Sequence, residues 1–220
     1  MAAGQQAERD IMITLYHLDT SRSERIVWLM EELGLPYKLE LHLRQPHGAA
    51  PDALKAIHPL GKAPIIRDGD TVLAESGAIV EYIVNRHAGG RLGVAPSAPM
   101  YARYLYWIHF AEGSLMSLMI VALVLTRVPD GDKSPAGIRV LARMKQMLSF
   151  VDAELAAGPY FVGEEFTAAD IMMTFTFTTM RHFLEYDLAP YPHIVAFLKR
   201  IEARPAFKKA MALAGPKVGT

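Results

Sequence analysis

The segment His58–Ile83, HPLGKAPIIRDGDTVLAESGAIVEYI, predicts a loop, two short strands joined by a tight turn, and a helix. Residues 65–67 and 71–74 form the two extended runs. Asp68-Gly69-Asp70 lies between them and is a turn sequence, because glycine adopts positive φ angles at little cost. Ser76 occupies the position where the cap of the following helix is expected. The segment therefore predicts a β-hairpin that leads directly into a helix.

The residues before this hairpin alternate between strand and helix patterns. Residues 11–16 alternate in hydrophobicity, residues 24–33 carry apolar side chains at helical spacing, and residues 37–43 alternate again. A strand–helix–strand crossover is almost always right-handed, so the two strands are predicted to be parallel. A short helical piece over residues 52–57 leads into the hairpin. The order predicts an α/β domain that ends near His87.

The residues beyond 100 show helical spacing and no strand pattern. Residues 98–127 predict one long helical run, bent near Gly113. The sequence Thr167-Ala168-Ala169-Asp170 has the spacing of a capping box. The helix that it opens has no charged residue from 171 to 180, so we expect it at the centre of an all-helical domain.

Glycine and proline concentrate between these two parts of the chain, which is typical of a linker. We therefore expect four parts: a polar, disordered tail (residues 1–10), an α/β domain (11–87), a linker (88–99) and an all-helical domain (100–220).

Composition narrows the classes of function. The 220 residues carry 23 basic and 23 acidic side chains, so the zero net charge gives no support to nucleic acid or an anionic membrane as the main partner. The chain has no cysteine, which excludes disulfides, a cysteine nucleophile and cysteine-ligated zinc. Its histidines show no HExxH or paired helical spacing, so we expect no metal site. The apolar stretches 113–126 and 171–180 are shorter than the ~18–20 residues of a membrane span, so we expect a soluble, cytoplasmic protein.

Three motifs together resemble the glutathione S-transferase family. His-Pro-Leu-Gly-Lys-Ala-Pro at 58–64 and Glu-Ser-Gly-Ala-Ile at 75–79 are similar to the glutathione-binding half of its thioredoxin-like domain, and Phe-Thr-Ala-Ala-Asp at 166–170 to the capping box of its helical domain. The resemblance covers nearly the whole chain from Ile11. It implies an α/β thioredoxin-like N-terminal domain followed by an all-α C-terminal helical domain. The segment Ser21-Arg22-Ser23 further resembles a bacterial and fungal branch of the family.

The resemblance also implies where glutathione binds. Pro64 would follow a cis peptide bond, Ala63 would lend backbone groups to the cysteinyl part, and the pair Glu75-Ser76 would bind the γ-glutamyl end. A helix N-terminus attracts a carboxylate independently of family, and Glu75 can pair with an ammonium group; the alternative is that Ser76 only caps its helix. Lys62 is a candidate for the glycine carboxylate, and the alternative is a solvated surface lysine.

The thiol to be activated belongs to glutathione, because the chain has no cysteine. A free thiol with a pKa of ~8.5 is only a few per cent ionised at pH 7, so the protein must stabilise the thiolate. In the family this group lies between the first strand and the first helix, where Thr20-Ser21-Arg22-Ser23 stands here. Ser21 and Thr20 are the candidate hydroxyls, with backbone N–H groups or Arg22 as the alternative. Ser23 is a candidate glutathione contact or the helix cap, and Ser21 and Ser23 could serve in capping alone.

A second, hydrophobic substrate needs its own pocket, which we expect along the first long helix of the second domain. Tyr106, Phe110, Ser114 and Ser117 share one face of that helix by their spacing. An aromatic stripe of this kind is also typical of a helix core.

The sequence therefore predicts an enzyme that conjugates glutathione to small hydrophobic electrophiles, working as a homodimer, with glutathione as co-substrate and no metal. The alternatives are a glutathione-dependent disulfide or peroxide reductase, and a non-catalytic, protein-binding member of the fold.

Overall fold

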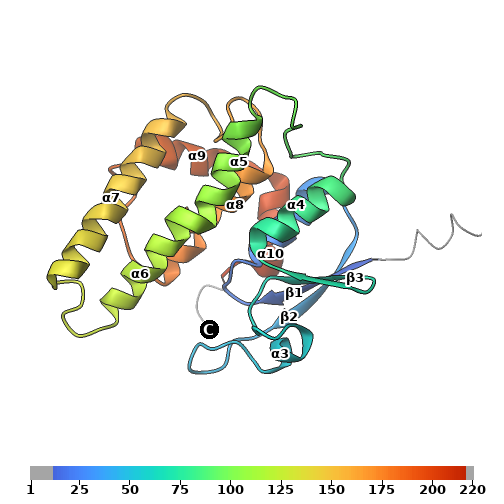
Figure 1. Cartoon of the computed structure of the whole chain (residues 1–220), viewed down its shortest axis with the longest axis horizontal. Coiled ribbons are helices and arrows are strands. Elements are labelled where there is room, and N and C mark those ends of the chain that lie inside the picture. The colour runs from blue at the N-terminus through green and yellow to red at the C-terminus, as the bar shows by residue number, and fades with distance from the viewer. Residues whose placement is uncertain (1–11, 217–220) are drawn as a thin grey trace, which may run out of the picture. The chain divides into compact units, whose positions relative to one another are not determined.

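The computed structural model describes residues 12–216, which form two compact units (Figure 1). One unit comprises the described residues up to Gly89 together with those from Pro205 onward, and the other comprises Gly90–Arg204. The disordered tail expected over residues 1–10 lies outside the described residues. The all-helical domain was expected to run through residue 220, but the residues from Pro205 onward group with the first unit instead.

The first unit is built on a four-stranded sheet. Its strands are β1 (Ile13–Leu18), β2 (Tyr37–His42), β3 (Ile65–Asp68) and β4 (Thr71–Ala74), in the order β2-β1-β3-β4. β1 pairs in parallel with β2, while β3 pairs antiparallel with both β1 and β4. The strand–helix–strand crossover and the hairpin are therefore confirmed. β1 begins and ends two residues later than the alternation of residues 11–16 indicated.

Helices cover both faces of this sheet. They are α2 (Glu24–Leu33), α3 (Ala53–Ile57), α4 (Ser76–Arg86) and α10 (Pro205–Ala214). Leu54 of α3 packs with Tyr16, Leu18 and Ile65. Successive side chains of a strand point to opposite faces, so His17 lies on the other face of β1, toward α2.

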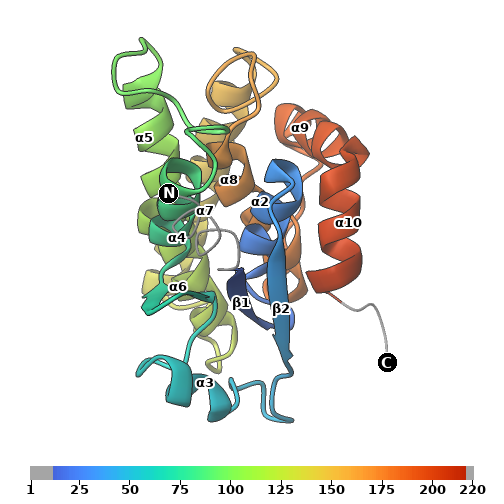
Figure 2. The ribbon, with the colours of Figure 1, turned by 90° about the vertical axis from the view of Figure 1, so that its right-hand side faces the viewer.

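The last helix, α10, packs against α2 (Figure 2). The ring of Phe207 meets the buried ring of Trp28 edge to face with centroids 4.9 Å apart, and Lys209 pairs with Glu31 at 2.7 Å. These contacts place α10 with the first unit. The local sequence does not indicate which element covers the apolar face of α10.

The second unit is all-helical, as expected. Its elements are α5 (Tyr101–Phe110), η1 (Ala111–Met116), α6 (Ser117–Thr126), α7 (Pro135–Leu155), α8 (Ala168–Phe177), η2 (Thr179–His182) and α9 (Pro192–Ala203). α6 and α7 lie side by side (Figure 1). Every residue of α8 is buried, which confirms the central helix predicted from its uncharged sequence. The predicted capping box between Thr167 and Asp170 is present at its start.

The bend expected near Gly113 is a π-helical segment, η1, between α5 and α6. A π-helical turn takes in one more residue than an α-helical turn, so the faces before and after it no longer follow α-helical spacing. The Ser117 hydroxyl accordingly donates to the carbonyl of Glu112, five residues earlier, at 2.8 Å. The prediction that Ser117 continues the face of Tyr106 and Phe110 assumed an uninterrupted α-helix.

Taken together, α5, η1 and α6 form a continuous helical run over Tyr101–Thr126, which is 26 residues long. By length and composition alone this run could cross a membrane, and 39% of its most apolar window is buried. The expectation that the region is too short counted only residues 113–126. A core helix of a soluble protein passes the same test, so length and composition do not separate the two.

Candidate functional site

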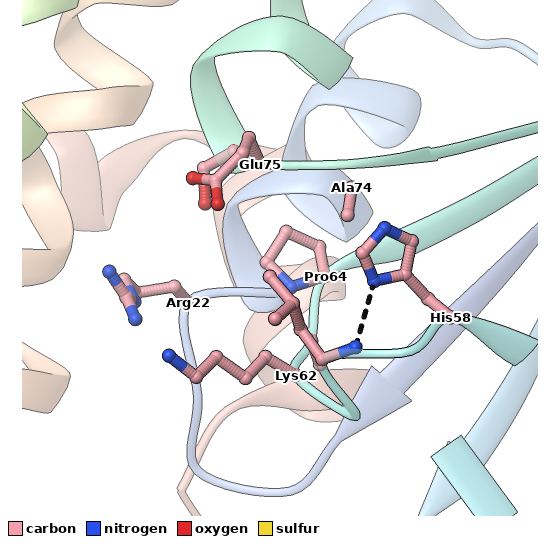
Figure 3. A pocket seen from close by; sticks show the side chains of 9 residues that line it. Arg22, His58, Lys62, Pro64, Ala74 and Glu75 are labelled. Atoms are coloured by element: carbon pink, nitrogen blue, oxygen red, sulfur yellow. Dashed lines mark hydrogen bonds between the residues drawn. The ribbon is translucent and has the colours of Figure 1, made fainter. Parts of the chain in front are cut away.

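A surface pocket in the first unit gathers residues from three separate segments. They come from the turn before α2, the loop between α3 and β3, and the junction of β4 with α4. The lining residues are Arg22, His58, Leu60, Lys62, Ala63, Pro64, Ala74, Glu75 and Ser76 (Figure 3). Five of the predicted glutathione contacts, from Lys62 to Pro64 and from Glu75 to Ser76, are therefore brought together in one place. Arg22 joins them from a segment about 40 residues away in the sequence.

Three charged side chains reach the same side of this pocket. The side chains of Arg22 and Lys62 both point to the left of the view in Figure 3, and the carboxylate of Glu75 lies on that side as well. Two cations and one carboxylate complement a ligand that carries carboxylates and an ammonium group, because opposite charges attract across a short distance. The pocket therefore suits a small zwitterionic peptide better than a neutral molecule.

The loop from His58 to Pro64 has a defined backbone shape. The Ala63–Pro64 bond is cis, as expected. Gly61 has a φ of +57°, a conformation that favours glycine, and a Cβ built there would lie 2.6 Å from Cγ of Lys55 in α3, so that side chain would have to move. The amide of Leu60 donates to Nδ1 of His58 at 3.4 Å. These features hold Lys62 and Ala63 at the pocket.

Helix α4 begins one residue earlier than predicted, so the cap position falls on Glu75 and not on Ser76. Glu75 occupies the cap position of α4 with a φ of +75° and makes no side-chain capping bond, and Ser76 is the first residue of the helix. The interpretation of Ser76 as the cap is therefore wrong. Both residues line the pocket at the amino end of α4, where backbone N–H groups and the helix dipole favour an anion.

The segment Thr20–Ser23 presents only one of its side chains to the pocket. Of its four residues, all of them described, only Arg22 is among the lining residues. The side chain of Ser21 is 7% exposed, and its hydroxyl donates to the carbonyl of Leu18 at 2.7 Å. Ser23 is fully buried and stands at the cap position of α2, but its hydroxyl makes no capping bond. Ser23 therefore stands at the cap position considered for it, and its backbone carbonyl accepts from the amide of Ile26 at 3.0 Å.

Arg44 anchors the first residues of the turn between β1 and α2, through hydrogen bonds to Asp19 and Thr20. Thr20 has a φ of +47°, an uncommon value for a residue with a side chain. The Arg44 side chain donates to the carbonyl of Thr20 at 3.0 Å and to the carbonyl of Asp19 at 3.1 Å, and the Arg44 amide donates to the Asp19 carboxylate at 2.6 Å. The turn is thus anchored at its start by a residue that follows β2.

Two comparisons with known proteins decide the family. The family model for the N-terminal domain of glutathione S-transferase matches residues 15–91, and the model for its C-terminal domain matches residues 115–205. The chain belongs to the glutathione S-transferase family. The transferase is 35% identical to Glutathione S-transferase 3 of Schizosaccharomyces pombe over 90% of this chain and 86% of that protein. It is 30% identical to Glutathione S-transferase 1 of Saccharomyces cerevisiae over 92% and 97%.

Solved structures agree with this assignment. A glutathione S-transferase from Actinobacillus pleuropneumoniae superposes on the transferase with a TM-score of 0.84 and 36% identity, over 94% of each chain. A theta-class enzyme from Xanthomonas axonopodis pv. citri, solved with glutathione bound, superposes with a TM-score of 0.73 and 25% identity, over 91% and 97%. The thioredoxin-like and all-helical fold class is confirmed, and the chain is a transferase that uses glutathione as co-substrate. Among residues 12–216, no three His, Asp or Glu side chains gather as a metal site would require.

The residues predicted for the second substrate lie in the other unit of the transferase. Tyr106 is 48% exposed, and its ring stacks on that of Phe110 with centroids 5.4 Å apart. Phe110 is buried and packs edge to face on Trp107. Ser114 lies half-buried within the π-helical segment. The two aromatic rings are brought together, with Tyr106 as the accessible one.

Sequence reasoning missed two histidines near the transferase site. His58 lines the pocket, although it was read only as the first residue of a motif. His17 is 1% exposed, and burial lowers its pKa to about 4, with the charge of Asp19 opposing and that of His42 adding to the effect. His17 is therefore neutral at pH 7. The sequence signal that could have identified His17 is the alternation along β1. It places His17 on the face of the strand toward α2, six residues before Ser23.

Proposed function

We propose that this glutathione S-transferase conjugates the thiolate of glutathione to small hydrophobic electrophiles in the cytoplasm. The observation that carries the proposal is the convergence of Arg22, Lys62 and Glu75 on one pocket at the amino end of α4. Glutathione carries carboxylates, an ammonium group and an ionisable thiol, so Lys62 can pair with a carboxylate, Glu75 with the ammonium group and Arg22 with the thiolate.

Each part of glutathione has a counterpart in the pocket. Glu75 pairs with the γ-glutamyl ammonium group, and Ser76 with the amino end of α4 receives the neighbouring carboxylate. Lys62 pairs with the glycine carboxylate. The backbone of Ala63, fixed by the cis bond to Pro64, bonds the cysteinyl part.

For the thiolate we propose the guanidinium group of Arg22. Ser21 and Thr20 were the first candidates, but the Ser21 hydroxyl is already the donor in its bond to the Leu18 carbonyl. Thr20 is not among the residues that line the pocket, whereas Arg22 is. A cation close to sulfur favours the ionised form and lowers the pKa of the thiol.

The proposal is tested by retention on immobilised glutathione, followed by turnover of an aryl halide, a peroxide and a disulfide with the same preparation. We expect retention and turnover of the aryl halide. Retention with turnover of the disulfide or peroxide alone would support the reductase instead. Retention without any turnover would support a binding protein, and absence of retention would contradict the glutathione site.

The Glu75→Ala variant is expected to bind glutathione about tenfold more weakly, because a charged hydrogen bond contributes ~1.5–3 kcal/mol and part of the loss is recovered by water. Glu75 is exposed, so the unfolding temperature should not change. Isothermal calorimetry measures the affinity. Glu202→Ala, which removes an exposed glutamate of α9, is the matched control, and equal affinities for the two variants would contradict the role of Glu75.

We further propose a homodimer, which is the commonest closed assembly of soluble proteins. Light scattering coupled to gel filtration is expected to give twice the 24.4 kDa mass of the chain at micromolar concentration. A particle of 24.4 kDa under those conditions would rule the dimer out.

A further inference from the structure

Four polar groups of β1 and of the turn that carries Arg22 form a continuous chain of short contacts. Nδ1 of His17 lies 2.7 Å from the Ser23 hydroxyl, the Ser23 hydroxyl lies 2.6 Å from the Ser21 hydroxyl, and the Ser21 hydroxyl lies 2.7 Å from the Leu18 carbonyl. All three side chains are buried. Each contact is short enough to need one proton between its two atoms.

Counting protons fixes the direction of this chain. A carbonyl cannot donate, so the contact with Leu18 must use the hydroxyl proton of Ser21. The contact between the two hydroxyls must then use the proton of Ser23. No hydroxyl proton is left for the third contact, so His17 must donate from Nδ1.

The opposite tautomer leaves a contact without a proton. If Nδ1 of His17 accepted from Ser23, the two serine oxygens would face each other at 2.6 Å with no hydrogen between them. If Ser23 instead donated to the Leu18 carbonyl, at 3.3 Å, the Ser21 proton would have to serve both of the shorter contacts. Because burial keeps His17 neutral at pH 7, Nδ1–H is a choice of tautomer and not the result of protonation.

We propose that His17 is a positioning residue of the glutathione site: as the Nδ1–H tautomer it heads a one-directional hydrogen-bond chain through Ser23 and Ser21 that holds Arg22 at the pocket. The two residues on either side of Arg22 are both members of the chain. The amide of Leu18 also donates to the Ser23 hydroxyl at 3.2 Å, and the amide of Ser23 to the Ser21 hydroxyl at 3.3 Å.

The chain has a chemical consequence for the serines. Each hydroxyl already donates its single proton within the protein, so neither has a proton to give to a thiolate. Arg44 fixes the start of the same turn from the other side, through Asp19 and Thr20. Within the segment Ser21–Ser23, Arg22 is the residue whose side chain lines the pocket.

The tautomer can be measured directly by ¹⁵N NMR of the full chain at pH 7, because a protonated ring nitrogen and a bare one have clearly different chemical shifts. The His17 signals are assigned by their loss in the His17→Asn variant. We expect a neutral ring with the proton on Nδ1. A neutral ring with the proton on Nε2 would overturn the proposal.

Two variants test the positioning role, which rests on the proposed glutathione site. The side-chain amide of His17→Asn can still donate to Ser23, whereas His17→Leu fills the space and cannot donate. Calorimetry is expected to show glutathione affinity within about twofold of wild type for Asn and about tenfold weaker for Leu. Equal affinities for two folded variants would overturn the proposal. If Leu does not fold, Ser23→Ala replaces it, with Ser23→Thr as its donor-retaining partner. Failure of the wild type itself to bind glutathione would instead overturn the proposed function, and the positioning role with it.

Discussion

Replacement of Asp170 by alanine is expected to lower the free energy of unfolding by about 3–4 kcal/mol. The carboxylate is fully buried and accepts from the amide of Phe161 at 2.9 Å, and from the amide and hydroxyl of Thr167 at 2.8 and 3.2 Å. Truncation leaves buried donors without an acceptor, at ~1–3 kcal/mol each, and removes a helix cap worth ~1 kcal/mol. Relief from burying the carboxylate offsets part of that sum.

Denaturant unfolding of the two proteins measures this loss. Asp187→Ala is the matched control, since Asp187 accepts a single amide bond, from Ala189, at an exposed site. That variant should lose about 1 kcal/mol or less. If both variants lose the same amount, the buried capping box does not have the role assigned to it.

The same carboxyl group gives the stability of the protein a defined pH dependence. Burial raises the pKa of Asp170 from 3.8 to about 6, although its hydrogen bonds with Phe161 and Thr167 act in the opposite direction. The folded state therefore binds its proton more tightly than the unfolded state does. The resulting stabilisation is fully present below pH 3.8 and is lost as the pH rises through about 6. The wild-type stability minus that of Asp170→Asn should fall by about 2 kcal/mol from pH 4 to pH 7, and a flat difference would contradict the raised pKa.

Replacement of Arg22 by glutamine is expected to raise the pKa of bound glutathione by about one to two units and to lower turnover at pH 7 by about ten- to a hundredfold. In the proposed site the guanidinium group supplies the positive charge that stabilises the thiolate, and a charged interaction of ~1.5–3 kcal/mol accounts for a shift of that size. The pH profile of kcat at saturating glutathione reports the pKa in the complex.

Two further variants separate charge from hydroxyl chemistry in that experiment. Arg22→Lys keeps the charge and should keep most of the wild-type profile. Thr20→Val keeps the branched shape at position 20 and removes only the hydroxyl, so the account expects an unchanged pKa. A shift in Thr20→Val with none in Arg22→Gln would return the activating role to the Thr20 hydroxyl.

Much of the fold follows from local sequence signals. The turn at Gly69, the alternation in residues 37–43 and the capping box at Thr167 each indicate one structure, and each is found. They could be predicted because their causes lie within a few neighbouring residues. Residues 62–64 and 75–76, to which two separate sequence motifs pointed, line one pocket.

Other features depend on contacts that no local pattern contains. α10 joins the first unit because Phe207 packs on Trp28, about 180 residues earlier in the chain. The hydroxyl of Ser21 turns inward because a carbonyl and a second serine lie within reach, which its position before a helix does not reveal. The π-helical segment changes the face of the long helix without a distinctive sequence. In each case the structure is determined by tertiary packing and not by the local secondary-structure propensity of the sequence.

The most direct test of the account is ultraviolet titration of the thiolate absorbance in the complex of the wild-type protein with glutathione. The chain has no cysteine, so any thiolate band comes from the ligand. The account predicts that bound glutathione titrates about two units below the free thiol, which is about 2.7 kcal/mol of preference for the anion. Titration of the bound thiol at the pKa of free glutathione would contradict the claim that this pocket activates it.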